Sequence, residues 1–203
     1  YVELWNLVFM QFDQKGPDQR VSLPSPSIDT GMGLERIAAV MQGVSDNFKT
    51  DIFQAIIQHS TALCGHSENP HHAIAHRVIA DHLRSSAFLL SEGVLPSNEG
   101  RGYVVRRILR RALRHVHYLQ SSSQHLALLL PTLIEKMGAA YPELGRAQDL
   151  IASVLIQEGE QFQELLHNGL KRMQGWMSGA QPGAVFPGKD AFTLYDTFGF
   201  PLD

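Results

Sequence analysis

The sequence has a single cysteine, Cys64, among its 203 residues. One cysteine excludes an internal disulfide and argues against a zinc site built from thiolates. We interpret Cys64 as a small, partly buried residue. The longest apolar runs, such as 126–130, fall far short of the ~20 residues that a membrane-spanning helix needs. No charged-then-apolar signal segment opens the chain, so the cytoplasm is the expected compartment and no membrane partner is expected.

Charged residues are few, and they are unevenly placed. They make up 18% of the chain, the apolar fraction is 44% and the net charge is −3, as in ordinary globular proteins. The segment 77–117 departs from this average, because it holds eight arginines, three acids and no lysine. The resulting local charge of +5 is typical of a surface that binds a polyanion.

The first 50 residues predict a small amount of β-structure. Residues 3–12 are rich in Trp, Leu, Val and Phe and contain no breaker, which favours a strand. Residues 13–26 resemble a polar loop, because glycine and proline interrupt them and proline closes them. A second short strand is expected over 27–30, and a helix with apolar residues at i, i+3, i+4 and i+7 follows it. Two strands alone are marginal in water, so we expect sequence outside this chain to complete the sheet.

From residue 51 onward, apolar residues recur at helical spacing. The expected helices cover 51–64, 72–91, 103–119, 124–138, 146–177 and 189–197, and the segment 138–145 is expected as a break. The sequence therefore predicts an α+β protein. Residues 1–48 would form a short piece of an antiparallel sheet, and residues 49–203 a mostly α-helical domain.

The most informative segment is 27–36, which reads SIDTGMGLER. A β-branched apolar run ends on Asp29, turns through Gly31 and Gly33, and enters a helix that carries Arg36 in its first turn. Glycines permit a sharp turn and the close approach of a ligand to the backbone. The helix start and the guanidinium suit a phosphate, whereas the carboxylate suits an ammonium group. One short element is therefore suited to hold a nucleotide phosphate and an amino acid's α-amine together.

This segment resembles motif 3 of the class II aminoacyl-tRNA synthetases, and in its wording that of the alanyl-tRNA synthetases. Four further stretches match the same family in the same order: Glu3–Phe12, Arg77–Ser85, Pro96–Tyr103 with the arginine-rich run after it, and Tyr195–Pro201. The five matches span nearly the whole chain. The resemblance implies that residues 1–48 are the C-terminal part of a class II catalytic domain and that residues 49–203 are the tRNA-recognition domain.

The resemblance also implies which residues contact the amino acid. Asn6 and Asp29 would hold the charged end of alanine. Gly31 would exclude larger side chains by backbone crowding, although hydrophobic pockets discriminate by only ~1–3 kcal/mol per methyl group. From the residues alone, Asn6 is equally well a strand amide that neighbouring backbone satisfies.

The nucleotide site implied by the family is less complete. Gly33 and Arg36 would contact ATP, and Mg²⁺ would accompany the nucleotide in the complete enzyme. Glu3 is a weaker candidate for contacting ATP or its Mg²⁺, and is equally well an exposed acid at a strand start.

The helix expected over 103–119 presents a basic face opposite its apolar face. Its arginines are Arg106, Arg110 and Arg114 at i, i+4 and i+8, with Arg107 and Arg111 one step round. No acid stands four residues away from them, so we expect the arginines to remain free for the phosphates of tRNA. Burial of some of them against acids from other helices, or a plain solvated face, is the alternative.

Two residues match the family's base-reading positions. In the alanyl enzymes, the asparagine and aspartate that match Asn98 and Asp196 read the G·U wobble pair in the acceptor stem of tRNA(Ala). The chemistry is sensible, because the A-form minor groove exposes the guanine N2 amino group as a donor to a carboxylate. An amide both donates and accepts. Without the resemblance, Asn98 is equally a turn residue and Asp196 a helix-end acid.

His72 and His76 have HxxxH spacing, which places both on one helix face. No third ligand stands at a familiar spacing, so we expect no metal site.

The resemblance therefore implies that the chain is part of an alanine-specific tRNA ligase. The complete enzyme would activate alanine with ATP and transfer it to the 3′ end of tRNA(Ala). Its expected partners are the tRNA acceptor stem, alanine, ATP and the remaining domains of the same enzyme. The chain contains no counterpart of motifs 1 and 2 or of the editing and dimerisation regions. We therefore assign no catalytic residue and expect no alanine activation by these 203 residues alone.

Two alternatives stay open at this point. One is a non-catalytic helical RNA-binding module in which the motif 3 segment is only structural. The other is a class II relative that uses a different amino acid.

Overall fold

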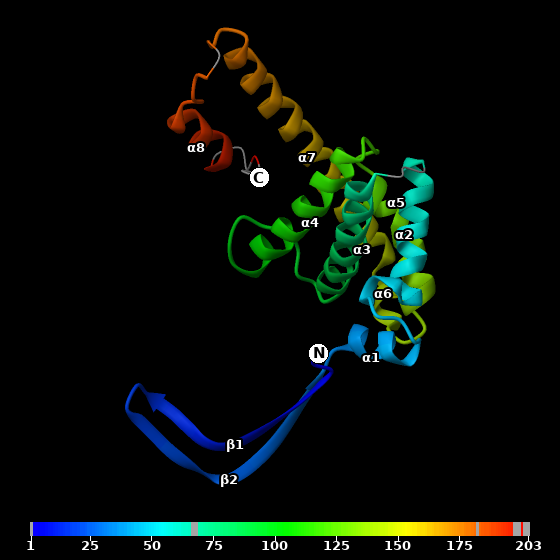
Figure 1. The fold of residues 1–203 in the computed structure, drawn as a ribbon, viewed down its shortest axis with the longest axis vertical. Helices are drawn as coiled ribbons and strands as arrows, with labels where there is room; N and C mark the ends of the chain where they lie inside the picture. The colour runs from blue at the N-terminus through cyan, green and yellow to red at the C-terminus, as the bar shows by residue number, and fades with distance from the viewer. Residues whose placement is uncertain (1, 66–68, 182, 197–199, 201–203) are drawn as a thin grey trace. The chain divides into compact units, whose positions relative to one another are not determined.

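A computed structural model describes residues 2–65, 69–181, 183–196 and 200 (Figure 1). The chain divides into two compact units, Tyr1–Gln54 and Ala55–Asp203. The first holds a β-ribbon and short helices, and the second is helical, so the predicted α+β class is confirmed. None of the helices in the described ranges is long and apolar enough to cross a membrane. The assignment of residues 1–48 and 49–203 to a catalytic and a tRNA-recognition domain stays a prediction.

Two long antiparallel strands form the ribbon, β1 over Trp5–Gly16 and β2 over Gln19–Met32. The predicted loop over 13–26 is wrong, because both strands extend through it and only Pro17 and Asp18 lie between them.

The two prolines that suggested a loop lie in an irregular part of the ladder. Met10 pairs with Ser27, whereas Phe12 pairs with Ser22, so the residues between these partners on β2, which include the prolines, bulge outward opposite β1. Proline cannot donate a ladder hydrogen bond, and within sheets it is accommodated at bulges and on edge strands. Each strand of a two-stranded ribbon is an edge strand, and so the prolines do not end β2.

One face of the ribbon is an exposed apolar surface. The register pairs Trp5 with Met32 and Phe9 with Ile28, and residues opposite one another point to the same side. This apolar face consists of Trp5, Leu7, Phe9, Ile28 and Met32. Phe9 is 63% and Ile28 67% exposed. Contiguous exposed apolar surface of this kind marks a contact surface in soluble proteins.

The rest of the first unit consists of short helical segments. Helix α1 (Leu34–Met41) follows Gly33, and a 3-10 turn (Asn47–Lys49) follows it, where Asp46 accepts a hydrogen bond from the Phe48 backbone N–H at 2.9 Å. Helix α2 covers Asp51–Cys64, which are its predicted bounds.

The second unit contains the remaining helices, all close to the predicted ranges except one. They are α3 (Pro70–Ser91), α4 (Gly100–Tyr118), α5 (His125–Met137), α6 (Pro142–Arg146), α7 (Gln148–Met177) and α8 (Gly188–Asp196). Helix α6 falls in the segment expected as a break. Pro142 occupies its first turn, where the missing N–H does no harm, and Leu144 is fully buried. The burial of Leu144 in the tertiary structure stabilises this turn. The glycines that suggested a break give no information about such burial.

The core of the second unit forms where α3 packs against α4, α5 and α7. Its fully buried side chains include Ile79, Leu83, Leu90, Leu109, Leu129, Leu133, Ile151 and Leu155. The apolar face predicted for α4 is confirmed, because Val105, Leu109, Ala112 and Val116 are each at most 2% exposed. Helix α4 therefore buries one side and presents the other.

Candidate nucleotide and nucleic-acid interfaces

The three residues predicted to contact alanine lie on one face of the ribbon. Asn6 pairs with Gly31, and Val8 pairs with Asp29. Side chains of directly opposed residues project from the same face, and alternate residues share a face. Asn6, Gly31 and Asp29 therefore share the face opposite the apolar one. The register of the strands brings together residues that are 25 positions apart in the chain.

The Glu3 carboxylate connects the predicted amino-acid and phosphate ligands. Asn6 Nδ2 donates to Glu3 Oε1 at 2.6 Å. Arg36 donates from one terminal nitrogen to the Glu3 backbone oxygen at 2.7 Å and lies 3.9 Å from Oε1. The Asn6 amide nitrogen thus has a neighbouring side chain as its partner. Since the Arg36 and Glu3 side chains are 46% and 63% exposed, their ion pair adds little stability.

The glycines of the turn differ in their surroundings. A Cβ on Gly33 would lie 3.2 Å from Arg36 Cδ, so glycine lets the arginine fold back over the start of α1. A Cβ on Gly31 would meet no atom within 4 Å. The Gly31 site is open in the described part of the chain, and exclusion of larger amino acids by Gly31 stays a prediction. One Asp29 oxygen accepts from the Thr30 N–H at 2.8 Å.

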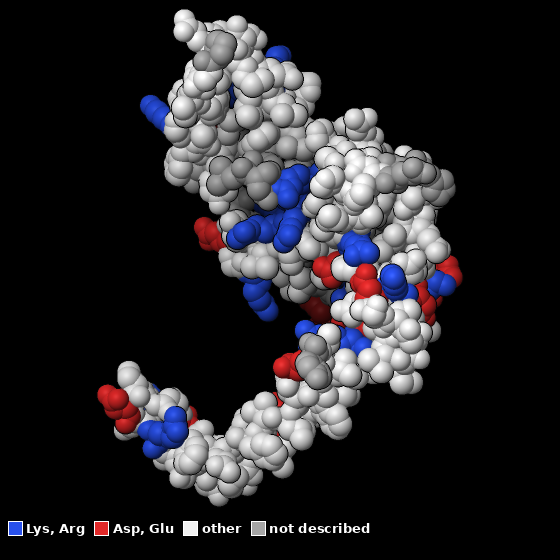
Figure 2. All heavy atoms as spheres, in the orientation of Figure 1, with Lys and Arg blue, Asp and Glu red and all other residues white. Residues whose placement is uncertain are grey.

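The five arginines predicted to contact tRNA fall into two groups on α4. Arg107 and Arg111 are exposed, whereas Arg106, Arg110 and Arg114 are half-buried. Figure 2 shows basic side chains gathered over this part of the molecule. The arginines at i, i+4 and i+8 are the more buried group.

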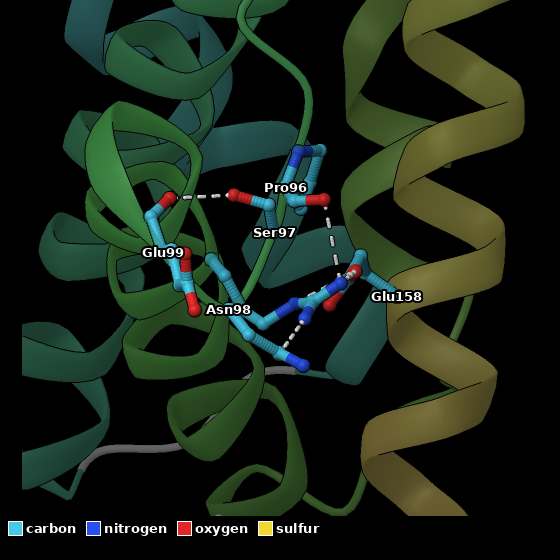
Figure 3. A network of polar contacts seen from close by, with 6 residues as sticks. Pro96, Ser97, Asn98, Glu99 and Glu158 are labelled. Atoms are coloured by element: carbon cyan, nitrogen blue, oxygen red, sulfur yellow. Dashed lines mark hydrogen bonds and ion pairs between the residues drawn. The ribbon is translucent and has the colours of Figure 1, made fainter.

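Arg106 is held by a network that crosses from α4 to α7 (Figure 3). Its Nε and one terminal nitrogen donate to Glu158 Oε1 at 3.2 and 2.9 Å. The other terminal nitrogen donates to Asn98 Oδ1 at 2.5 Å, and a longer contact of 3.4 Å reaches the Pro96 carbonyl. The expectation that these arginines remain free for phosphate is therefore wrong for Arg106, and the alternative of burial against an acid from another helix holds for it. Its partner lies 52 residues away, where an i+4 test cannot find it.

Glu158 also acts on a second arginine. It is only 5% exposed, although it is charged. Burial lowers the pKa of Arg110, and the nearby Glu158 carboxylate partly offsets this effect. One buried acid therefore compensates the charge of two arginines that the sequence assigned to phosphate.

The loop that carries Asn98 lies tightly against α4. A Cβ on Gly102 would collide with the Leu95 carbonyl oxygen and the Ser97 side chain. Ser97 Oγ in turn donates to the Glu99 carbonyl at 2.7 Å. Glycine at position 102 thus permits the close approach that places Asn98 beside Arg106.

Asp196 is the last residue of α8, and its side chain lies outside the described residues. The same holds for most of the stretch that follows it, except Phe200, whose N–H donates to the Leu194 carbonyl at 2.8 Å. The expected approach of Asp196 to Asn98 stays a prediction.

A buried cluster of polar side chains escaped the sequence analysis. Ser60 Oγ lies 2.8 Å from His76 Nδ1 and 2.7 Å from His125 Nε2. Ser121 Oγ lies 2.8 Å from the second His125 nitrogen. Burial, reinforced by the neighbouring histidines, lowers the pKa of His125 to about 4, and burial also lowers the pKa of His76. The cluster is a structural hydrogen-bond network of neutral imidazoles.

The HxxxH pair of α3 is divided between two environments. His76 belongs to this buried cluster, whereas His72 packs edge-on against Tyr118 with ring centroids 5.5 Å apart. Across the described ranges, no three His, Cys, Asp or Glu side chains gather as metal ligands do.

Comparison with known proteins extends over the entire chain. Residues 1–203 match the family model described as tRNA synthetases class II (A). Curated relatives named alanine–tRNA ligase are 56% identical in Rhizorhabdus wittichii, 56% in a Caulobacter species and 55% in Caulobacter vibrioides, each over 203 residues. The chain spans 23% of the length of each of these relatives.

Proposed function

Because the chain belongs to the class II (A) tRNA synthetase family, we propose that it is part of an enzyme that ligates alanine to tRNA(Ala). In the proposed reaction, the alanine carboxylate attacks the α-phosphorus of ATP and expels pyrophosphate, which gives alanyl-adenylate. A hydroxyl of the 3′-terminal ribose of the tRNA then attacks the alanyl carbonyl and expels AMP. The observation that carries the proposal is the shared face of Asn6, Asp29 and Gly31, in a chain 56% identical throughout to proteins named alanine–tRNA ligase.

The ribbon face suits the charged end of an amino acid. Asp29 offers a carboxylate to the ammonium group, and charge-assisted hydrogen bonds of this kind are about twice as strong as neutral ones. Asn6, ordered by its hydrogen bond to Glu3, would hold the substrate from the same side. Positioning of this kind contributes to catalysis by presenting the alanine carboxylate to the phosphate.

The adjoining helix start suits a nucleotide. Arg36 spends one contact on the Glu3 backbone and is half-exposed, so further N–H donors of its guanidinium remain available to a phosphate. The first backbone N–H groups of α1 carry a partial positive charge, which also favours binding of the phosphate. Mg²⁺ would bind chiefly to the ATP phosphates, as this ion commonly does. Glu3, whose carboxylate lies 3.9 Å from Arg36, is a weaker candidate for contacting the ion.

The second unit would bind the acceptor stem. Arg107 and Arg111 are the exposed members of the basic face, and phosphate contacts give affinity without sequence preference. Asn98 and Asp196 would distinguish the G·U pair in the minor groove. The remaining domains of the enzyme would cover the apolar face of the ribbon, and tRNA charging would place the protein in the cytoplasm.

A chimaeric enzyme tests the proposal. These 203 residues replace the matching segment of the Caulobacter vibrioides alanine–tRNA ligase. The chimaera should charge tRNA(Ala) with alanine, and Asp29→Asn should reduce alanine-dependent ATP–pyrophosphate exchange. A folded chimaera that binds tRNA but never activates alanine would instead favour a non-catalytic RNA-binding module. Activation of a different amino acid would favour another member of the class.

A further inference from the structure

Arg106 is bonded differently from the exposed arginines beside it. Its guanidinium donates hydrogen bonds both to Glu158 of α7 and to the Asn98 side chain, which Figure 3 labels. We propose that Arg106 is a positioning residue that holds the Asn98 amide with its NH₂ group outward, toward the base pair. This inference rests on the proposed role of Asn98 in acceptor-stem recognition, and it removes Arg106 from the phosphate ligands.

The chemistry of the two groups determines the orientation of the amide. A guanidinium only donates hydrogen bonds, whereas an amide donates through nitrogen and accepts through oxygen. The contact of 2.5 Å from Arg106 must therefore use Asn98 Oδ1. If the amide were flipped, its NH₂ group would face the N–H group of Arg106, and two donors cannot form a hydrogen bond. Asn98, which is exposed, is left with Nδ2 as its outward group.

Glu158 fixes the arginine in turn. Two nitrogens of Arg106 converge on Glu158 Oε1 at 3.2 and 2.9 Å, and this carboxylate is almost fully buried. Turning the guanidinium toward a phosphate would break these bonds and leave a buried charge poorly compensated, which is strongly unfavourable. The bonds to Glu158 therefore favour a positioning role over a phosphate contact that would draw the guanidinium away from this carboxylate.

The orientation narrows what Asn98 recognises. An outward NH₂ group needs an acceptor, and the minor-groove edge of the uridine supplies one in its O2 atom. Every pair with a pyrimidine has this atom, but the wobble pair displaces its uridine, so O2 occupies a different position in G·U than in A·U. The guanine amino group is a donor, so it must be matched by an acceptor such as the Asp196 carboxylate. Asn98 and Asp196 would thus read opposite halves of the G·U pair with opposite hydrogen-bonding polarity.

Arg106→Lys separates positioning from charge, because lysine keeps the positive charge but lacks the planar fork. Binding of the 203-residue chain to G·U and A·U microhelices is measured over a range of salt concentrations. In Arg106→Lys we expect the salt dependence to stay as in the wild type and the G·U preference to fall to that of Asn98→Ala. Combining the two changes should lower the preference no further.

Arg107→Ala is the matched control on the exposed side of the same helix. It should reduce the slope of log K against log salt by about 0.7–0.9, the value for one lost phosphate contact, and keep the G·U preference. An Arg106→Lys chain that retains the wild-type preference would overturn the proposal. So would an Arg106→Gln chain whose only change is a reduced slope, because that is the signature of a phosphate ligand.

A measurement without RNA tests independently whether Arg106 holds the Asn98 amide. The side-chain NH₂ signals of Asn98, identified by their loss in Asn98→Ala, should move in Arg106→Lys and stay in place in Arg107→Lys. Unmoved signals would overturn the positioning role of Arg106. If the signals move but the wild-type chain shows no G·U preference, Arg106 does position Asn98, and the proposed RNA recognition is refuted. If Arg106→Lys fails to fold, Glu158→Gln loosens the same guanidinium and should move the same signals.

Discussion

Asn6 lies directly opposite Gly31 in the antiparallel register of β1 and β2. The pairing places an amide beside a position that has no side chain, on the face that also carries Asp29. A Cβ on Gly31 would meet no atom of the described chain. Whatever restricts this position therefore has to be a bound substrate or another part of the complete enzyme.

Gly31→Ala should change specificity and leave stability unchanged. The added methyl group has open space in the chain, so the unfolding free energy should stay within about 0.5 kcal/mol of the wild type. In the chimaeric enzyme, the methyl group would enter the space of the alanine side chain. The ratio of kcat/KM for alanine to that for glycine should fall by roughly 1–3 kcal/mol in free-energy terms. An unchanged ratio in pyrophosphate exchange would remove Gly31 from the pocket.

Asp29→Asn should weaken alanine binding selectively. Losing a hydrogen bond to a charged group costs about 1.5–3 kcal/mol, so the alanine KM should rise by roughly one to two orders of magnitude. Asp13→Asn, an exposed acid on the same ribbon, is the control and should leave KM unchanged. If tRNA affinity falls together with alanine affinity, Asp29 has a structural role.

Gly102→Ala should displace the loop that carries Asn98. The new Cβ would collide with the Leu95 backbone oxygen, which has no flexible end to move aside. Overpacking of this kind costs typically 1–3 kcal/mol, so the melting temperature should fall and the G·U preference with it. Gly145→Ala meets no atom within 4 Å and should leave both unchanged. Full retention of both in Gly102→Ala would show that the loop does not depend on this close approach.

The helical unit should lose stability in mild acid. Because His125 has a pKa of about 4 in the folded chain against about 6.5 when unfolded, the unfolded state binds more protons between these values. The contribution of neutral His125 to the free energy of unfolding is complete above pH 6.5 and is lost as the pH falls toward 4. The loss should amount to about 3 kcal/mol at most.

Urea unfolding followed by far-UV circular dichroism at several pH values measures this effect. His125→Gln should flatten the pH dependence, because the amide does not titrate, whereas exposed His71→Gln should leave it intact. A wild-type stability that is constant from pH 7 to pH 4.5 would contradict the assignment of a neutral buried imidazole.

Local pattern located most of the fold. Apolar spacing placed α2 at its observed bounds, because helix periodicity depends on neighbours three and four residues away. The same reasoning failed for β2, where proline suggested a loop although the exposed edge and the bulge accommodate it. It also failed for α6, since the burial of Leu144 is a tertiary effect.

For the site residues too, the sequence identified candidates, whereas their long-range contacts came only from the structure. Motif resemblance singled out Asn6 and Asp29, but only the strand register shows that they share a face. The partners of Arg106 and His125 lie 52 and 65 residues away along the chain. No local test of charge or polarity can anticipate such pairs, which is why Arg106 was expected to be free and the buried serine–histidine cluster was missed.

Binding of the 203-residue chain to matched acceptor-stem microhelices tests the central claim most directly. Wild type and Asp196→Ala are titrated with G·U, G·C and A·U stems at two salt concentrations. We predict that the wild type prefers G·U by about 1–3 kcal/mol and that its affinity for all stems falls steeply with salt. Asp196→Ala should lose the preference and keep most of the salt-dependent binding. Equal affinity of the folded wild-type chain for all three stems would contradict the account.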